Sequence, residues 1–214
     1  QAGSFATSGL FADLQPGVIG VGGSINVTTG SLNLSNEGTI SASTFNQGNA
    51  GNIGISANQI DLRGNSAIAT QVDDEATGNA GNLNIKTQIL NVQEESQISS
   101  ATQGNGNGGN LTVEADTIIL TGSDRKLATG LLSSVDTTAN GSGGNIDITA
   151  NRLFIRDFAD IFSGSTGNGE AGDINIIANF LEISGKGSSI ASLTNIGDGG
   201  DINLGIGNLL LLRG

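Results

Sequence analysis

A short phrase recurs seven times along this chain, and its spacing constrains the fold more than any other feature. The phrase is Gly, then Asn, Asp or Ser, then an aliphatic residue, any residue and a second aliphatic residue. Successive copies begin 28, 30, 28, 35, 28 and 28 residues apart. A period of about 20 to 50 residues is typical of proteins built from stacked repeats. The copies begin at Gly23, Gly51, Gly81, Gly109, Gly144, Gly172 and Gly200.

Within each repeat, three short segments alternate between apolar and polar residues. In the first full repeat these segments contain Ile25 and Val27, Leu32 and Leu34, and Ile40. Alternation with a period of two is the pattern of a half-buried β-strand, and no window places apolar residues at helical spacing. One such unit can bury its apolar face only against its neighbours. The sequence therefore predicts an all-β parallel β-helix, a solenoid of about seven coils of about 28–30 residues, with three short strands in each coil.

The register of the repeats predicts a single solenoid over residues 1–214. A partial coil covers 1–21, and further coils begin near 22, 50, 80, 108, 143, 171 and 199, the last of them incomplete. The fourth coil has seven extra residues, around 123–129, between its second and third strands, and residues 127–132 resemble residues 5–11. Both ends of the sequence fall within a coil. We expect a section of a longer repeat protein, which continues by covalent repetition or by end-to-end stacking.

A polar residue follows the glycine of the phrase in every repeat. In a stacked solenoid these side chains form a column along the axis, in which they can hydrogen-bond from coil to coil. The two aspartates at one end of the column would repel each other, which predicts a solvated end. We expect the glycine to have a positive φ or to turn tightly into the first strand. The predicted structural ladder comprises Ser24, Asn52, Asn82, Asn110, Asn145, Asp173 and Asp201.

The composition argues against several functional classes. The chain has 20 acidic and 8 basic residues, a formal net charge of −12, and phosphate contacts to nucleic acid need Lys and Arg. It has no Cys and no His, so the commonest catalytic bases and nucleophiles are missing. Two matches to the dinucleotide-binding pattern, at 104–109 and 167–172, precede predicted strands rather than helices. We therefore expect no nucleic-acid partner, no enzyme activity and no catalytic residue.

Acidic residues in two loops are the candidates for a metal site. Asp73, Asp74 and Glu75 are consecutive, and Asp198 and Asp201 lie beside glycines near the end of the chain. Calcium prefers several oxygen ligands, but the nine-residue calcium-binding repeat of some β-solenoids is absent. A solvated acidic loop is the simpler interpretation, and weak calcium binding is the alternative. No other cofactor is expected.

Apolar residues at outward positions of the strands predict a contact surface. Phe154 lies between two inward-facing residues, so its side chain should face solvent. In the last coil, the same alternation turns Leu209 and Leu211 inward. An exposed apolar stripe often marks an interface, although the inserted loop or a neighbouring segment could cover it. The predicted stripe comprises Ile119, Phe154, Phe158, Phe162, Phe180 and Leu210.

Several phrases of the repeat resemble one family of proteins. Residues 38–52 read Gly-Thr-Ile-Ser-Ala-Ser-Thr-Phe-Asn-Gln-Gly-Asn-Ala-Gly-Asn, and residues 97–102 read Gln-Ile-Ser-Ser-Ala-Thr. These phrases resemble the repeat shaft of the filamentous-haemagglutinin-like exoproteins of bacterial two-partner secretion, over nearly the whole chain. The resemblance implies a right-handed parallel β-helix that passes unfolded through a dedicated outer-membrane transporter. The family's secretion motifs Asn-Pro-Asn-Gly-Ile and Asn-Pro-Asn-Leu are missing, so this segment is not the targeting domain.

The same resemblance implies a secreted or cell-surface bacterial protein with host-cell, surface or matrix ligands. We expect a structural or adhesive shaft that mediates adhesion or forms an extracellular matrix. The alternative is a subunit of an extracellular filament whose copies associate end to end, and a more remote one is a β-helix that binds or cleaves polysaccharides. Fibres formed by the isolated chain would favour the filament, whereas a stable monomer would favour the shaft.

Overall fold

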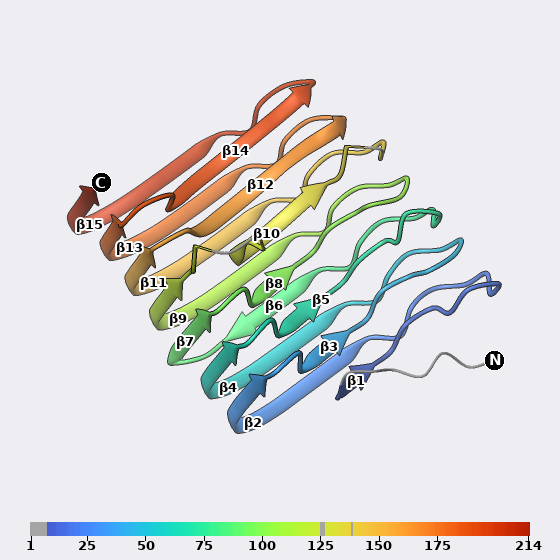
Figure 1. Cartoon of the computed structure of the whole chain (residues 1–214), viewed down its shortest axis with the longest axis horizontal. Coiled ribbons are helices and arrows are strands. Elements are labelled where there is room, and N and C mark those ends of the chain that lie inside the picture. The colour runs from blue at the N-terminus through green and yellow to red at the C-terminus, as the bar shows by residue number, and fades with distance from the viewer. Residues whose placement is uncertain (1–7, 125–126, 138) are drawn as a thin grey trace.

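The computed structural model describes residues 8–124, 127–137 and 139–214. Every regular element in these ranges is a β-strand, so the described chain has no helix that could cross a membrane. Figure 1 shows the strands stacked side by side along one axis in the order of the sequence. Residues 5–7, part of the predicted similarity to 127–132, lie outside the described residues. The strands are β1 (Gly9–Phe11), β2 (Ile25–Ser35), β3 (Thr39–Ser41), β4 (Ile53–Arg63), β5 (Ala67–Ala69), β6 (Leu83–Lys86), β7 (Ile89–Gln93), β8 (Gln97–Ser99), β9 (Leu111–Thr121), β10 (Thr129–Val135), β11 (Ile146–Arg156), β12 (Ala159–Asn168), β13 (Ile174–Ser184), β14 (Ser189–Ile196) and β15 (Ile202–Arg213).

Two parallel sheets form the wall of the solenoid. The third-strand sheet has the order β1-β3-β5-β8-β10-β12-β14, and the long-strand sheet has the order β15-β13-β11-β9-β6-β4-β2, with β7 pairing with β4 and β9. Each residue pairs with the residue at the same place one coil away, as Ile53 does with Ile25 and with Leu83. This register confirms the predicted parallel β-solenoid of about seven turns.

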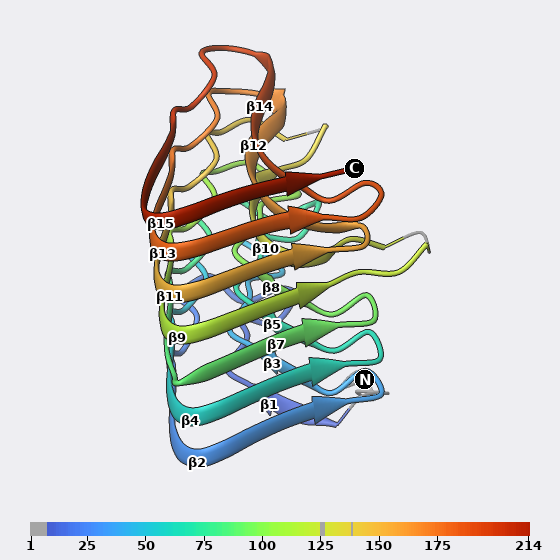
Figure 2. The ribbon, with the colours of Figure 1, turned by 90° about the vertical axis from the view of Figure 1, so that its left-hand side faces the viewer.

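The first two predicted strands of a coil join into one bent strand. In β4, for example, the pairing with β2 continues from Ile53 to Arg63 through Ala57. Figure 2 shows the bend in each long strand, after which the second leg of the strand runs across the face toward the viewer. Only the third coil keeps two separate strands, β6 and β7, among the described residues. The alternation predicted three strands per coil because it does not distinguish a bend from a break.

The interior is a column of aliphatic side chains. Leu111, Ile118 and Leu131, from the three inward positions of the fourth coil, are all 0% exposed. The equivalent Ile202 in the last coil is 42% exposed, since no further described coil covers it. Each buried aliphatic side chain contributes roughly 1.5–3 kcal/mol, so a coil is stable only when neighbours cover both of its faces.

The recurring glycine lies where consecutive coils approach most closely. A Cβ on Gly81 would lie 1.8 Å from the carbonyl oxygen of Gly51, and one on Gly109 would lie 2.1 Å from that of Gly81. Positive φ occurs three residues earlier, as at Gly78 with a φ of 144°. The prediction of a positive φ at the phrase glycine is therefore wrong. The close approach of neighbouring backbones, which was not predicted, requires a glycine at this position.

A column of buried hydroxyl groups faces these glycine corners. Ser100 donates to the Gly81 carbonyl at 2.7 Å, and Ser133 donates to the Gly109 carbonyl at 2.9 Å. The same hydroxyls accept hydrogen bonds from the backbone N–H of Gly109 and of Gly144, both at 2.9 Å. Each serine therefore ties the third-strand sheet to two glycine corners and satisfies polar groups that have no access to water.

The last coil differs from the prediction by one residue. The pairing of β15 with β13 shifts between Ala178 and Phe180 because β15 has one extra residue at the bend. Such a bulge moves every later side chain to the opposite face of the strand. Leu210 consequently pairs with the buried Leu181 and lies in the core-facing column. The prediction that Leu210 faces outward is wrong, and the leucines on either side of it take the outward positions.

The extra residues of the fourth coil lie between β9 and β10, where the repeat spacing predicts them. Residues 125 and 126 within this insertion are outside the described part of the chain.

Candidate contact surfaces

The polar residue after each phrase glycine forms a ladder on the outer corner. The Oδ1 atoms of Asn82, Asn110 and Asn145 each accept from the backbone N–H of the next ladder residue at 2.9 Å. Asp173 accepts from the N–H of the exposed Asp201 at 2.8 Å. The ladder thus joins side chains to backbone rather than amide to amide. It runs without a break through Ser24, Asn52, Asn82, Asn110, Asn145, Asp173 and Asp201.

Two further polar columns lie beside this ladder, and the sequence reasoning missed both. In one column, three residues upstream, Asn79 Oδ1 accepts from the N–H of Asn107 at 2.9 Å. In the other, amides bond to one another: Asn140 donates to Asn105 at 2.8 Å and accepts from Asn168 at 2.9 Å. The phrase Gly-Asn-x-Gly-Asn, with its two asparagines per coil, is a signal that could have identified the first column.

Apolar side chains gather on the outer face of the second leg of the long strands. The rings of Phe154 and Phe180 have centroids 5.3 Å apart. Phe154 pairs with Ile119 one coil below, and Leu209 pairs with Phe180 one coil above. All these positions alternate with core-facing residues, so they face outward. We call this surface the second-leg patch; it comprises Ile119, Phe154, Phe180, Leu209 and Leu211.

An ion pair lies within the second-leg patch, because Glu182 pairs with Phe154 on one side and with Leu211 on the other. The Arg156 guanidinium lies 4.4 Å from the centroid of the Phe154 ring and donates to both carboxylate oxygens of Glu182, at 3.3 and 3.1 Å. The hydrogen bond from Arg156, with a second one from Ser184, lowers the pKa of Glu182 below its ordinary value. The arrangement holds a cation over an aromatic face, which favours a rigid surface at this position.

The six residues of the predicted stripe do not form one surface. Ile119, Phe154 and Phe180 belong to the second-leg patch, and Leu210 belongs to the core-facing column. Phe158 lies in the turn between β11 and β12, with a φ of 64° and the Lys186 ammonium 5.8 Å from its ring centroid. Phe162 lies on the third-strand sheet, where it pairs with residues of β10 and β14. Alternation predicts inward and outward positions, but it does not say which sheet carries them.

A groove of about 300 Å³ hollows the outer face of the third-strand sheet beside Phe162. We call it the third-strand groove. Its lining combines apolar side chains with amides, hydroxyls and one carboxylate. The principal lining residues are Gln71, Gln97, Ser99, Ala101, Gln103, Leu132, Ser134, Asp136 and Phe162.

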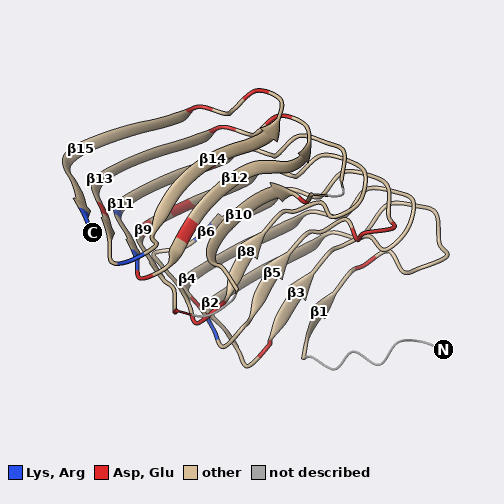
Figure 3. Ribbon diagram, turned by 45° about the horizontal axis from the view of Figure 1, so that its top comes forward, with Lys and Arg blue, Asp and Glu red and all other residues tan. Residues whose placement is uncertain are grey.

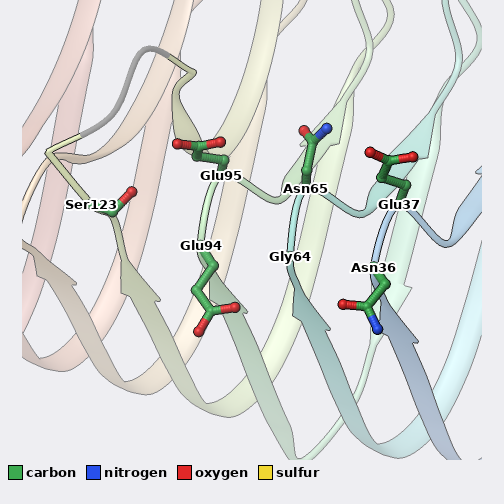
Figure 4. Close-up of a pocket in the computed structure, with 7 residues that line it drawn as sticks. All are labelled: Asn36, Glu37, Gly64, Asn65, Glu94, Glu95 and Ser123. Atoms are coloured by element: carbon green, nitrogen blue, oxygen red, sulfur yellow. The ribbon is translucent and has the colours of Figure 1, made fainter.

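A second groove, of about 620 Å³, follows the turns that lead from the long strands to the third strands. Asn36 and Glu37 have φ values of 52° and 68°, and Glu94 and Glu95 repeat this with 52° and 64°. Figure 4 shows Glu37 and Glu95 pointing to the same side, with Asn65 between them. Left-handed backbone suits asparagine better than glutamate. The φ values therefore explain the choice of Asn36, but not the choice of Glu37, Glu94 and Glu95.

The predicted acidic metal candidates do not converge. Figure 3 shows Asp and Glu scattered over both strands and turns along the solenoid. Over residues 8–124, 127–137 and 139–214, no three His, Cys, Asp or Glu side chains group in a way that could hold a metal ion. The loop with Asp73, Asp74 and Glu75 and the loop with Asp198 and Asp201 therefore offer no preformed site in the described chain.

Comparisons with models of protein families, with curated proteins and with solved structures found no match to this chain.

Proposed function

We propose that this chain is the structural shaft of a secreted or cell-surface bacterial protein, and that it acts in adhesion or in forming an extracellular matrix. The observation that carries the proposal is the uninterrupted stack of coils. Parallel pairing runs from β2 to β15 in one sheet and from β1 to β14 in the other. Such a stack makes an extended rod whose outer surface repeats along its length, and extended surfaces of this kind serve binding in other repeat proteins.

The resemblance of the repeats to two-partner exoproteins supports the location of this shaft. In that family a dedicated outer-membrane transporter exports the unfolded chain, and the absence of Cys in this sequence is compatible with such passage. Host-cell, surface or matrix components are the partners that this proposal implies.

The second-leg patch is the surface that we assign to partner contact. Its apolar side chains lie on one outer face, and the ion pair of Arg156 and Glu182 lies among them. Aromatic side chains with a neighbouring arginine are the composition typical of the energetic centre of a protein interface.

To test this proposal, beads that carry the chain are applied to cultured epithelial cells and to a fibronectin coat, and the fraction of beads retained is measured. Retention should exceed that of bare beads and fall about fivefold or more when Phe154 and Phe180 are both changed to Ser. Ile177→Ser is the matched control, since Ile177 is a 64% exposed apolar residue before the bend. Retention no better than that of bare beads would refute the adhesive role. Equal retention of both variants would refute the patch.

A filament built by end-to-end association is the second candidate function. It is favoured by the open face of β15, where Leu210 is 43% exposed and Leu212 is 66% exposed although both occupy core-facing columns. A further coil would cover these side chains and pair with the edge of β15, and a second copy of the chain could supply that coil.

A further inference from the structure

The third-strand groove lies where small residues on the outer face of the sheet stand next to larger ones. Ser99, Ala101 and Ser134 line its centre, at outward positions of two neighbouring coils. In the row of Ser99, the next two coils carry the larger Leu132 and Phe162. In the row of Ala101 and Ser134, the preceding coil carries Gln71. The hollow lies between these larger side chains.

One wall of the groove is apolar. Phe162 and Leu132 pair across adjacent strands, so both side chains stand on the same outer face. A Cβ on Gly164 would lie 2.7 Å from the ring of Phe162 and 2.3 Å from the Leu193 carbonyl oxygen. The ring thus lies over the position that Gly164 leaves free, and it offers a half-buried aromatic surface to the groove.

The rest of the lining offers hydrogen bonds that the protein itself does not use. The side-chain amides of Gln71 and Gln103 make no hydrogen bond to any described residue, and each combines donors with an acceptor. Gln97 donates to the Ala128 carbonyl at 2.8 Å, which leaves its carbonyl oxygen available. The Asp136 carboxylate adds an acceptor, although it already holds the N–H and hydroxyl of Thr137.

The kind of ligand follows from this combination. No Lys or Arg lines the groove, which disfavours an acidic ligand. A volume of about 300 Å³ is at the small end for a binding site and fits one or two rings of a small molecule. A sugar ring presents C–H groups on its faces and hydroxyls at its edge, which match an aromatic wall and a rim of amides and hydroxyls.

We propose that the third-strand groove binds a neutral saccharide, with Phe162 stacking on the sugar ring and Gln71, Gln103 and Asp136 bonding its hydroxyls. The site adds a ligand class that the shaft proposal does not require. The groove lies on the third-strand sheet, whereas the second-leg patch lies on the long-strand sheet, so the two surfaces can be tested separately.

Native gels that contain dextran, galactomannan or laminarin provide the test, with polygalacturonate as the acidic comparison. At least one neutral polysaccharide should retard the chain. Phe162→Ala and Gln103→Ala should each weaken the apparent dissociation constant about fivefold or more. Ile177→Ala should leave retardation unchanged, since Ile177 lies on the other sheet. If Phe162→Ala unfolds the chain, Gln103→Ala still tests the proposal. The side-chain amide of Gln103 makes no hydrogen bond within the described chain, so its loss should not affect folding.

The proposal is overturned if no neutral polysaccharide retards the chain, if only polygalacturonate does, or if both groove variants are retarded like the unmodified chain. Any of these outcomes would leave the adhesive shaft standing, because that proposal is tested through Phe154 and Phe180.

Discussion

At the scale of single residues, hydroxyl groups inside the solenoid matter as much as its aliphatic side chains. Ser133 is fully buried, yet it both donates to Gly109 and accepts from Gly144. Its neighbour Ser134 faces the third-strand groove. Two consecutive serines thus have opposite roles, which the sequence alone does not distinguish.

Ser133→Ala should therefore destabilise the chain by about 1–3 kcal/mol, since it leaves a buried N–H and a buried carbonyl without a partner. Ser134→Ala is the matched control and should change stability by less than about 0.5 kcal/mol. Urea unfolding followed by circular dichroism measures both. Equal losses in the two variants would contradict the buried hydroxyl column.

The ion pair beside Phe154 predicts a pH dependence. The pKa of Glu182 is lowered from its ordinary 4.5, mainly by the hydrogen bond from Arg156. The stabilisation from this carboxylate is therefore present above pH 4.5 and is lost as the pH falls through the lower value of the folded chain. Glu182→Gln should cost about 0.5–1 kcal/mol near neutral pH, and this difference should shrink in acid. The measurement is the melting temperature of Glu182→Gln and of the unmodified chain between about pH 7 and about pH 3. A difference that stays constant over this range would contradict the prediction.

At the scale of the coil, the phrase glycine sets how closely neighbours can stack. Gly81→Ala would place a Cβ 1.8 Å from the Gly51 carbonyl oxygen, so the two backbones would have to separate. We expect a loss of about 1–3 kcal/mol or more. Gly30→Ala is the control, since nothing lies within 4 Å of its Cβ position, and it should be neutral or stabilising by up to about 1 kcal/mol. The free energies of unfolding of the two variants decide the point, and similar values would refute the close-approach argument.

The coil is also the scale at which the sequence was most informative. The spacing of the phrase and the alternation of residues such as Ile53 and Ile55 predicted the parallel solenoid and its core. The bend that merges two strands was not predictable, because small residues such as Ala57 are compatible with a bend or a break. The bulge that turns Leu210 inward was missed for a related reason: the one extra residue of β15, opposite Ala178 to Phe180 of β13, is visible only in the pairing.

The contact surfaces were less predictable than the coil. Phe154 and Phe180 come together because their strands are adjacent in the long-strand sheet, whereas Phe162 follows a turn and joins the other sheet. Sequence alternation contains no information on that turn. The third-strand groove depends on small side chains in two neighbouring coils, at Ser99, Ala101 and Ser134, which no single motif encodes.

At the scale of the whole molecule, the filament alternative predicts self-association through the open face of β15. Stacking of a second copy would cover Leu210 and Leu212, while the net charge of −12 opposes it. Added salt screens that repulsion, so sedimentation velocity should show larger species at high salt and high protein concentration. Leu210→Lys combined with Leu212→Lys should keep the chain monomeric. A monomer under every condition would argue against the filament and favour the shaft.

The rod itself can be measured directly, because the chain contains no Cys and engineered cysteines would be unique labels. Thr28, Thr149 and Ile177 belong to one outward column, in the first, fifth and sixth coils. Spin-label distances from Thr28→Cys should be about 19 Å to Thr149→Cys and about 24 Å to Ile177→Cys, at ~4.8 Å per coil. Ser56→Cys with Gly205→Cys, also five coils apart, should match the longer value. Distances that do not increase with the number of coils would contradict a stacked rod.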